Sequence, residues 1–342
     1  MSQPRSFIER FPMPLKLVLG TGLLALAAFP MVPGDSMDFY VQLVTQMMIL
    51  AIFAMSLDLL QGVTGLVSLG HAAFFGLAGY MLAFQTPEDH AVSLWTSLPL
   101  AMLAAGAAAL VIGALVVRTK GIYFIMVTMA FAQMVFYLFH DNKPLGGSDG
   151  LYVYFRPDAT AIGLDLENKL HFYYFTLACL LLCYLFLRRL LFSPFGRALS
   201  GIRVNEHRMR AVGFGTYGYK LAAFTLAGML AGLAGYLWAA QTGFVNPDLM
   251  GFHMSAHAVM MLILGGMGNF AGAIIGAFAF EWVMHFFKDV TKHWQLLMGS
   301  FIVLAVVIAP QGILGLFHRL TSGRAAQPAK VDGEAAGEEK AA

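Results

Sequence analysis

Five polar side chains of the types that carry protons or bind ligands stand in or beside long apolar segments of this sequence. They are Asp58, His71, Gln133, Glu281 and His285. A charge at the centre of a bilayer costs about 2.5–3.5 kcal/mol on insertion scales, so Asp58 and Glu281 are expected to face protein or water. One interpretation is a proton relay, as in a secondary transporter. The other is structural, with Asp58 bonding backbone groups freed near Gly62 and Glu281 lying close to an interface.

Other chemical arrangements in the sequence are incomplete. His253 and His257 share a helix face at four-residue spacing but lack a third ligand, so no metal site is predicted. Cys179 and Cys183 have the same spacing within an apolar segment, which predicts small buried thiols rather than a disulfide. No Ser/His/Asp or Cys/His arrangement supports an enzyme. The dipeptide Gly-Lys does not occur, so the chain lacks a GxxxxGK[ST] loop, and ATP would have to be bound by another subunit. No cofactor is predicted on this chain.

The elements that must position these residues are membrane helices. Of the 342 residues, 59% are hydrophobic and 12% are charged, and the mean hydropathy is +0.71. A soluble domain has about 25% charged residues, so the chain is predicted to be an all-α, polytopic helical bundle. Ten apolar segments are predicted as spans, and most are near the length of about 20 residues that crosses a bilayer. They cover 17–32, 39–60, a third segment ending near Phe84, 97–117, 121–139, 172–187, 221–240, 255–264, 270–287 and 294–309.

Two of the ten segments leave a choice open. The first follows Arg5, Arg10 and Lys16, as in a signal peptide, but no clear small-x-small cleavage site follows, and a retained span is preferred. The eighth segment is short enough to be re-entrant. The expected domains are an N-terminus at 1–16, a membrane domain at 17–317 and a disordered tail at 318–342.

The distribution of positive charge predicts the orientation. If ten spans alternate in direction, one face of the membrane carries 16 of the 21 Lys and Arg residues, including those of both termini and of residues 193–220. The opposite face carries Lys143, Arg156, Lys169, Lys288 and Lys292. Cytoplasmic loops are enriched in Lys and Arg, so both termini and residues 193–220 are predicted to be cytoplasmic, and residues 141–170 periplasmic. This predicts a multi-pass protein of the bacterial inner membrane.

Glycine clusters interrupt two of the apolar segments. The stretch 62–80, GVTGLVSLGHAAFFGLAGY, holds Gly65, Ser68, Gly70 and His71, and a second cluster runs through Gly265, Gly266 and Asn269. Glycine at this density breaks a helix or lets two helices approach closely. Irregular backbone at membrane depth persists only where protein or a water-filled cavity covers it. Both clusters are therefore predicted to be helix breaks beside a translocation path, and their similarity reflects either an internal repeat or convergent packing.

The longest basic segment, residues 193–220, predicts a short amphipathic helix that begins near Pro194 and ends before Gly213 and Gly215. Its candidate functional residues are Arg197, Arg203, Glu206, Arg210 and Gly213. One interpretation is a basic loop lying on anionic lipid headgroups. The other is a helix that docks on a cytoplasmic ATPase and couples ATP hydrolysis to transport.

Five motifs, in order over residues 40–317, resemble the M-type (LivM-like) permease subunits of branched-chain amino acid ABC transporters. They are SLGHAAFFGLAGY at 68–80, LGGSDGL at 145–151, the loop containing FGRAL, Glu206 and Gly213, LGGMGNFAGAIIGA at 264–277 and APQGILGL at 309–316. Ala211-Val212 departs mildly from the alanine-leucine that is usual before the glycine. These permeases often carry Asn where Asp58 stands, which favours the structural interpretation of Asp58.

The resemblance implies an ABC importer in which this chain pairs with a homologous second permease. Two ATPase subunits would bind the 193–220 loop, and a periplasmic substrate-binding protein would deliver branched-chain amino acids. The presumed path residues, including Ser68, His71 and Asn269, are small or modestly polar, which suits a zwitterion. Urea or a short amide is the alternative substrate. The alternative class is a proton-coupled secondary transporter that uses Asp58 and Glu281.

Overall fold

The computed structural model describes residues 13–31, 37–160, 163–309 and 311–315, and most of these residues are helical. The α-helices are α1 Met13–Ala28, α2 Met37–Asp58, α3 Ala72–Gln85, α4 Leu94–Val116, α5 Ile122–His140, α6 Lys169–Phe192, α7 Pro194–Val204, α8 Glu206–Ala211, α9 Thr216–Thr242, α10 Phe252–Gly265, α11 Phe270–Val290 and α12 Trp294–Ile308. A π-helix, η2 (Leu59–Thr64), continues α2, and two short strands, β1 (Leu151–Tyr152) and β2 (Phe244–Val245), pair antiparallel. The predicted all-α class is confirmed. The predictions for residues 1–12 and 318–342 lie outside the described residues.

Every one of the ten predicted apolar segments contains a helix, but a count of ten spans is not confirmed. Among the described residues, seven helices are long and apolar enough to cross a membrane, and they begin at Met37, Leu94, Ile122, Lys169, Thr216, Phe270 and Trp294. Helices α3 and α10 have only 14 residues each, and α1 has 16. A 14-residue helix is about 21 Å long, less than the hydrocarbon thickness of about 30 Å. The glycine breaks shorten α3 and α10, because each of these helices abuts one.

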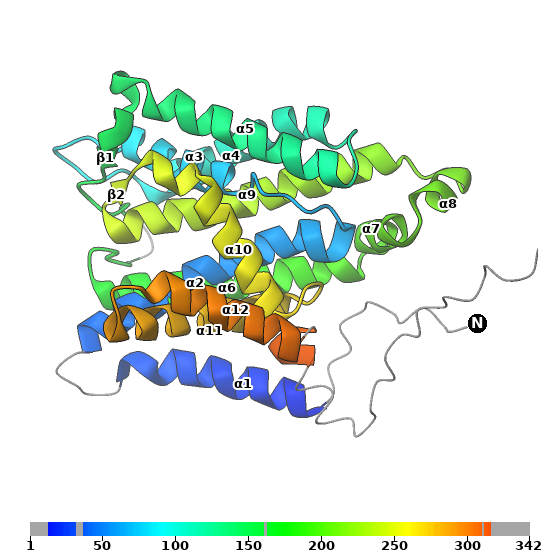
Figure 1. Ribbon diagram of the computed structural model, residues 1–342. Coiled ribbons are helices and arrows are strands. Elements are labelled where there is room, and N and C mark those ends of the chain that lie inside the picture. Colours follow the sequence, from blue (N-terminus) through cyan, green and yellow to red (C-terminus); the bar gives the residue numbers. More distant parts are fainter. Residues whose placement is uncertain (1–12, 32–36, 161–162, 310, 316–342) are drawn as a thin grey trace, which may run out of the picture.

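Helix α2 lies at the centre of the bundle, and nearly all its residues from Val41 to Asp58 are buried. Helix α9 lies against α2, α3 and α4, while α11 lies against α2 and α10 (Figure 1). By contrast, α4, α5 and α12 expose large apolar side chains such as Leu103, Met126 and Val307. A helix that is apolar on its exposed face is stable where lipid or a partner helix covers it. The bundle is therefore built as a membrane protein.

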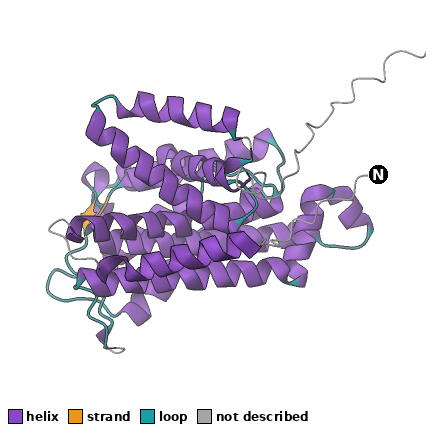
Figure 2. Cartoon of the chain, turned by 90° about the horizontal axis from the view of Figure 1, so that it is seen from below, coloured by secondary structure: helices purple, strands orange, loops and turns teal. Residues whose placement is uncertain are grey.

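The connecting segments gather at two opposite ends of the bundle. Figure 1 shows α7 and α8 projecting at one end, together with the start of α1 and the end of α12, and β1 and β2 at the other. Figure 2 shows the same separation, with the strands and most loops at one end and short helices at the other. The residues 141–160 and the 193–220 segment therefore lie at opposite ends, as predicted from their charge.

The loop between α5 and α6 is pinned to the bundle. Its strand β1 pairs Leu151 with Val245 of β2. The guanidinium of Arg156 donates to the carbonyl of Ala240 at 3.2 Å and to that of Leu166 at 3.1 Å, and it lies 4.6 Å from the ring centroid of Phe172. This end therefore presents a fixed surface rather than a loose loop.

Candidate functional site

The first helix break covers residues 59–71 and is held by side-chain hydrogen bonds. The α2 helix widens into the π-helix η2, in which Thr64 Oγ1 donates to the Leu60 carbonyl at 2.5 Å. An irregular segment follows, where Gln61 Nε2 donates to the Ser68 carbonyl at 3.4 Å. Helix α3 then starts at Ala72, whose backbone N–H donates to Ser255 Oγ of α10 at 3.0 Å. Buried polar backbone at membrane depth must be satisfied within the protein, and these bonds do so.

His71 and Ser56 form a buried pair that closes this break. His71 Nε2 lies 2.9 Å from Ser56 Oγ, and both side chains are 0% exposed. Because the single hydroxyl proton of Ser56 goes to the Phe53 carbonyl at 2.7 Å, we assign Nε2 of His71 as the donor. The His71 ring also stacks on Phe53 with centroids 5.6 Å apart. His71 thus fixes the start of α3 against α2.

Ser68 and Gly70 also pack inside the protein. Ser68 is buried, and its hydroxyl accepts from the Gly70 N–H at 3.4 Å. A Cβ on Gly70 would overlap the backbone of Thr128 on α5, so glycine permits this close approach. The predicted irregular break is confirmed at Ser68, Gly70 and His71, whereas their role as path residues stays a prediction.

The second helix break, residues 265–269, depends on glycine instead. A Cβ on Gly265 would overlap the Gly272 carbonyl and come within 3.0 Å of the Gly276 backbone nitrogen, so only glycine lets α10 and α11 close this tightly. Gly266 lies against the backbone of Gln311 in the same way. Asn269 caps α11 by accepting from the Ala271 N–H at 3.1 Å. Gly265 and Gly266 therefore form a packed joint.

The two breaks meet each other at Asp58. Its Oδ1 accepts a hydrogen bond from the Gly268 N–H at 2.8 Å, which joins the end of α2 to the second break. The backbone of Gly268 lies so close to Gly62 that a Cβ on Gly62 would come within 2.5 Å of the Gly268 nitrogen. Asp58 therefore does bond freed backbone, as the structural interpretation expected, but that backbone belongs to the second break.

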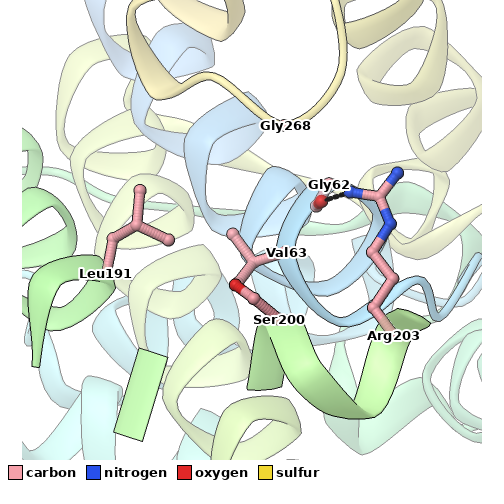
Figure 3. A pocket seen from close by; sticks show the side chains of 6 residues that line it. All are labelled: Gly62, Val63, Leu191, Ser200, Arg203 and Gly268. Carbon is pink, nitrogen blue, oxygen red and sulfur yellow. Dashed lines mark hydrogen bonds between the residues drawn. The ribbon is translucent and has the colours of Figure 1, made fainter. Parts of the chain in front are cut away.

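Arg203 of α7 reaches the same point from the 193–220 segment. Its guanidinium donates to the carbonyl of Gly62, as Figure 3 shows. A small space beside this bond is lined by Gly62, Val63, Leu191, Ser200, Arg203 and Gly268. These residues come from the end of α6, from α7, from η2 and from the second break, and Figure 3 shows Arg203 of α7 extending to Gly62 of η2. One point thus brings together Asp58, both breaks and the predicted coupling helix.

The 193–220 segment forms two helices rather than one. Asn205 separates α7 from α8 because its side chain caps α8, accepting from the Arg208 N–H at 2.9 Å. Helix α7 buries Ala198, Leu199 and Ile202 and exposes Arg197. The predicted amphipathic pattern is confirmed in α7, and the end before Gly213 is confirmed in α8.

Glu206 at the start of α8 collects three cations from three segments. Its carboxylate lies 2.9 Å from Lys120 Nζ, 2.9 Å from Lys220 Nζ and 2.5 Å from Arg210 Nη2. Thr216 Oγ1 also donates to it at 3.2 Å. Partial burial alone would raise the pKa of Glu206, but the hydrogen bonds and charges of Lys220 and Lys120 outweigh burial and hold that pKa at about 2. Glu206 is therefore charged at neutral pH and ties α8 to α9 and to the α4–α5 loop.

Gly213 lies in the turn between α8 and α9, not in a packed contact with the described part of the chain. A Cβ on Gly213 would meet no atom of the described residues within 4 Å, although its φ of +94° favours glycine. Its role is thus to let the chain turn between α8 and α9. A larger residue at position 213 would therefore act through backbone strain or on a partner that covers this turn.

The site also contains residues that sequence reasoning did not single out. In the sequence, Lys120 and Lys220 contribute only to the count of positive charges. Each directly precedes an apolar segment, and this position was the signal that could have singled them out. Lys220 is 5% exposed and paired with Glu206. Ser56, Gly268 and Gln311 were missed because their partners are distant in sequence.

Comparison with known proteins places this geometry in a family. The family model described as the branched-chain amino acid transport system permease component matches residues 39–309. The chain belongs to this permease family. It is therefore a transport subunit of the ABC permease class and a multi-pass membrane protein, and it is not itself a catalytic subunit.

Individual relatives agree over most of this permease. The "high-affinity branched-chain amino acid transport system permease protein LivM" of Salmonella typhimurium is 31% identical over 338 residues, which cover 91% of this chain and 78% of the relative. The Escherichia coli K12 protein of the same description is 31% identical, with 87% and 75% covered. The "autoinducer 2 import system permease protein LsrC" of Photorhabdus laumondii is 33% identical over 34% of this chain and 37% of that relative. No solved structure gives a significant match.

Proposed function

We propose that this chain forms half of the translocation path of an ABC importer for branched-chain amino acids. A homologous second permease forms the other half, two ATPase subunits bind ATP below α7 and α8, and a periplasmic substrate-binding protein delivers the amino acid. The observation that carries the proposal is the contact of α7 with the first helix break through Arg203 and Gly62. A loop that only lay on headgroups would have no reason to bond the buried backbone of Gly62.

The substrate follows from the family and from the two relatives that cover most of the chain, whose descriptions name branched-chain amino acids. The LsrC likeness covers about a third of the chain and carries less weight. Deleting the gene in its host and measuring uptake of labelled leucine and labelled urea tests this choice. Loss of leucine uptake is expected. Lost urea uptake with undiminished leucine uptake, in a strain without a second leucine system, would overturn the substrate and leave the permease standing.

The alternative of a proton-coupled transporter needs Asp58 and Glu281 to exchange protons. Asp58 instead accepts from the Gly268 N–H. Glu281 lies on α11, about 16 Å along the helix axis from its first residue, Phe270, at a rise of 1.5 Å per residue. The separation supports a structural role for Asp58 and an energy source outside this chain.

The proposed orientation places both termini, α7 and α8 in the cytoplasm. Its support is the charge split together with the location of α7 and α8 opposite β1 and β2. Val204, at the end of α7, is 67% exposed and suits a single-cysteine test better than the half-buried Ser200. In a background with Cys179→Ser and Cys183→Ser, Val204→Cys is expected to resist an impermeant maleimide in intact cells. Labelling from outside would reverse the orientation.

A further inference from the structure

Arg203 makes a connection that surface attachment of α7 does not require. The buried face of α7, formed by Ala198, Leu199 and Ile202, already fixes the helix on the bundle. Arg203 nevertheless extends its side chain over Gly65, where its Cγ lies 3.0 Å from the position of a Gly65 Cβ, and it donates to Gly62. The last four carbonyls of a helix have no intrahelical partner, and Gly62 lies in the last turn of η2. Arg203, which is itself exposed, thus supplies a donor to the buried end of η2.

Asp58 extends this connection to the second break. The Gly62 backbone that accepts from Arg203 lies against Gly268, and Gly268 donates to Asp58. A Cβ on Gly268 would lie 3.4 Å from the Gly62 carbonyl oxygen and 3.6 Å from Arg203 Nη1. Movement of Arg203 therefore acts on a point where both breaks are in van der Waals contact.

We propose that Arg203 and Asp58 are positioning residues that make the two helix breaks move together with α7. The proposal rests on the proposed function, because an ATPase must move α7. Arg203 transfers displacement of α7 to the first break through Gly62, and Asp58 keeps the second break attached to the first through Gly268. Without either bond, α7 can still dock on the ATPases, but its movement no longer repositions the breaks.

Arg203→Met separates this role from packing, because methionine retains an apolar stem over Gly65 but has no donor. Arg203→Lys restores a donor, and Arg189→Ala removes an exposed arginine at the same end of the bundle as a control. The full importer is reconstituted in proteoliposomes, and labelled leucine transported per ATP hydrolysed is measured. We expect Arg203→Met to lower this ratio by about tenfold, because the coupling bond to Gly62 is lost. Arg203→Lys recovers part of the loss, and Arg189→Ala leaves the ratio unchanged.

A ratio in the assembled Arg203→Met complex equal to that of the unaltered importer would overturn the proposal. Asp58→Asn keeps an Oδ1 acceptor for the Gly268 N–H and is expected to retain the ratio, whereas Asp58→Leu lowers it. An Asp58→Asn variant as uncoupled as Asp58→Leu would show that the charge, and not the hydrogen bond to Gly268, matters.

A second measurement does not depend on the identity of the substrate. Val67 lies in the first break and is 40% exposed, so Val67→Cys in the cysteine-free background reports movement of the break by its rate of maleimide labelling. ATP is expected to change this rate in the importer and to leave it unchanged when Arg203→Met is added. If leucine is not transported but ATP still changes the labelling in an Arg203-dependent way, the substrate assignment fails and the link stands. An ATP response that persists with Arg203→Met contradicts the link.

Discussion

The two helix breaks and the 193–220 segment use glycine and charge in opposite ways. At the breaks, a Cβ on Gly265 would overlap neighbouring backbone, and the polar groups are joined by short-range hydrogen bonds such as that of Ser56 with His71. In the loop, a Cβ on Gly213 would meet open space, and the segments are joined by ion pairs to Glu206. The breaks should therefore be sensitive to side-chain volume, and the loop to charge and pH.

The largest effect is expected from Gly265→Ala. The added methyl group has no room beside Gly272 and Gly276, and overpacking against backbone is expected to cost more than about 3 kcal/mol, above the usual range for a packed core. Melting of the purified protein in detergent and the fraction that stays monodisperse measure the loss. The matched control is Gly299→Ala on α12, where a Cβ meets nothing within 4 Å. Equal melting temperatures for the two variants would refute the close contact at Gly265.

The next largest effect is expected from Ser56→Ala, which leaves His71 Nε2 buried without its partner. The free energy of unfolding should fall by about 1–3 kcal/mol, the usual cost of an unsatisfied buried polar group. Thr45→Val on the same helix is the control, because the Thr45 hydroxyl donates to a carbonyl of its own helix, that of Val41. Thermal unfolding of both variants checks this, and an equal loss for the two would show that the Ser56–His71 bond contributes nothing specific.

Glu206→Gln tests the role of charge in the loop. Lys220, whose side chain is 6% exposed, would lose its anionic partner, and stability at pH 7 should fall by about 1–3 kcal/mol. Because the pKa of Glu206 is lowered to about 2 from about 4.3 in an unfolded chain, its contribution is complete above that unfolded value. The contribution is lost as the pH falls toward 2.

Unfolding of the unaltered protein and of Glu206→Gln at several pH values checks this prediction. The difference between them should stay constant from neutral pH down to about pH 5 and shrink below that, since the carboxylate titrates only there. A difference that shrank between pH 8 and pH 6 would mean that another group titrates.

The smallest effect is expected from Gly213→Ala. Its φ of +94° costs an L-residue about 1–2 kcal/mol, with no added steric overlap. The variant should assemble normally and show at most a modest fall in substrate-stimulated ATP hydrolysis by the importer. A loss of assembly as severe as that expected for Gly265→Ala would show that a partner subunit covers this turn.

The sequence predicts much of this comparison because composition and local pattern decide it. Apolar length locates the helices, Pro194 and Gly213 bound the loop helices, and the glycine clusters locate both breaks. The hydrogen bonds that the sequence does not predict join residues that are distant in the chain. The Asp58–Gly268 bond joins residues 210 positions apart, and the Arg203–Gly62 bond joins residues 141 apart. Neither helical periodicity nor glycine spacing encodes such a pairing. The sequence therefore predicts that Asp58 bonds backbone, but it does not identify Gly268 as the partner.

The central claim is that ATP hydrolysis on partner subunits drives amino acid movement through this chain. It is tested most directly by reconstituting the chain with its second permease, ATPases and binding protein in proteoliposomes and measuring accumulation of labelled leucine. The account predicts accumulation that requires ATP on the face of α7 and α8 and that persists when the proton gradient is collapsed. Accumulation driven by a proton gradient without ATP, and abolished by Asp58→Asn, would contradict it.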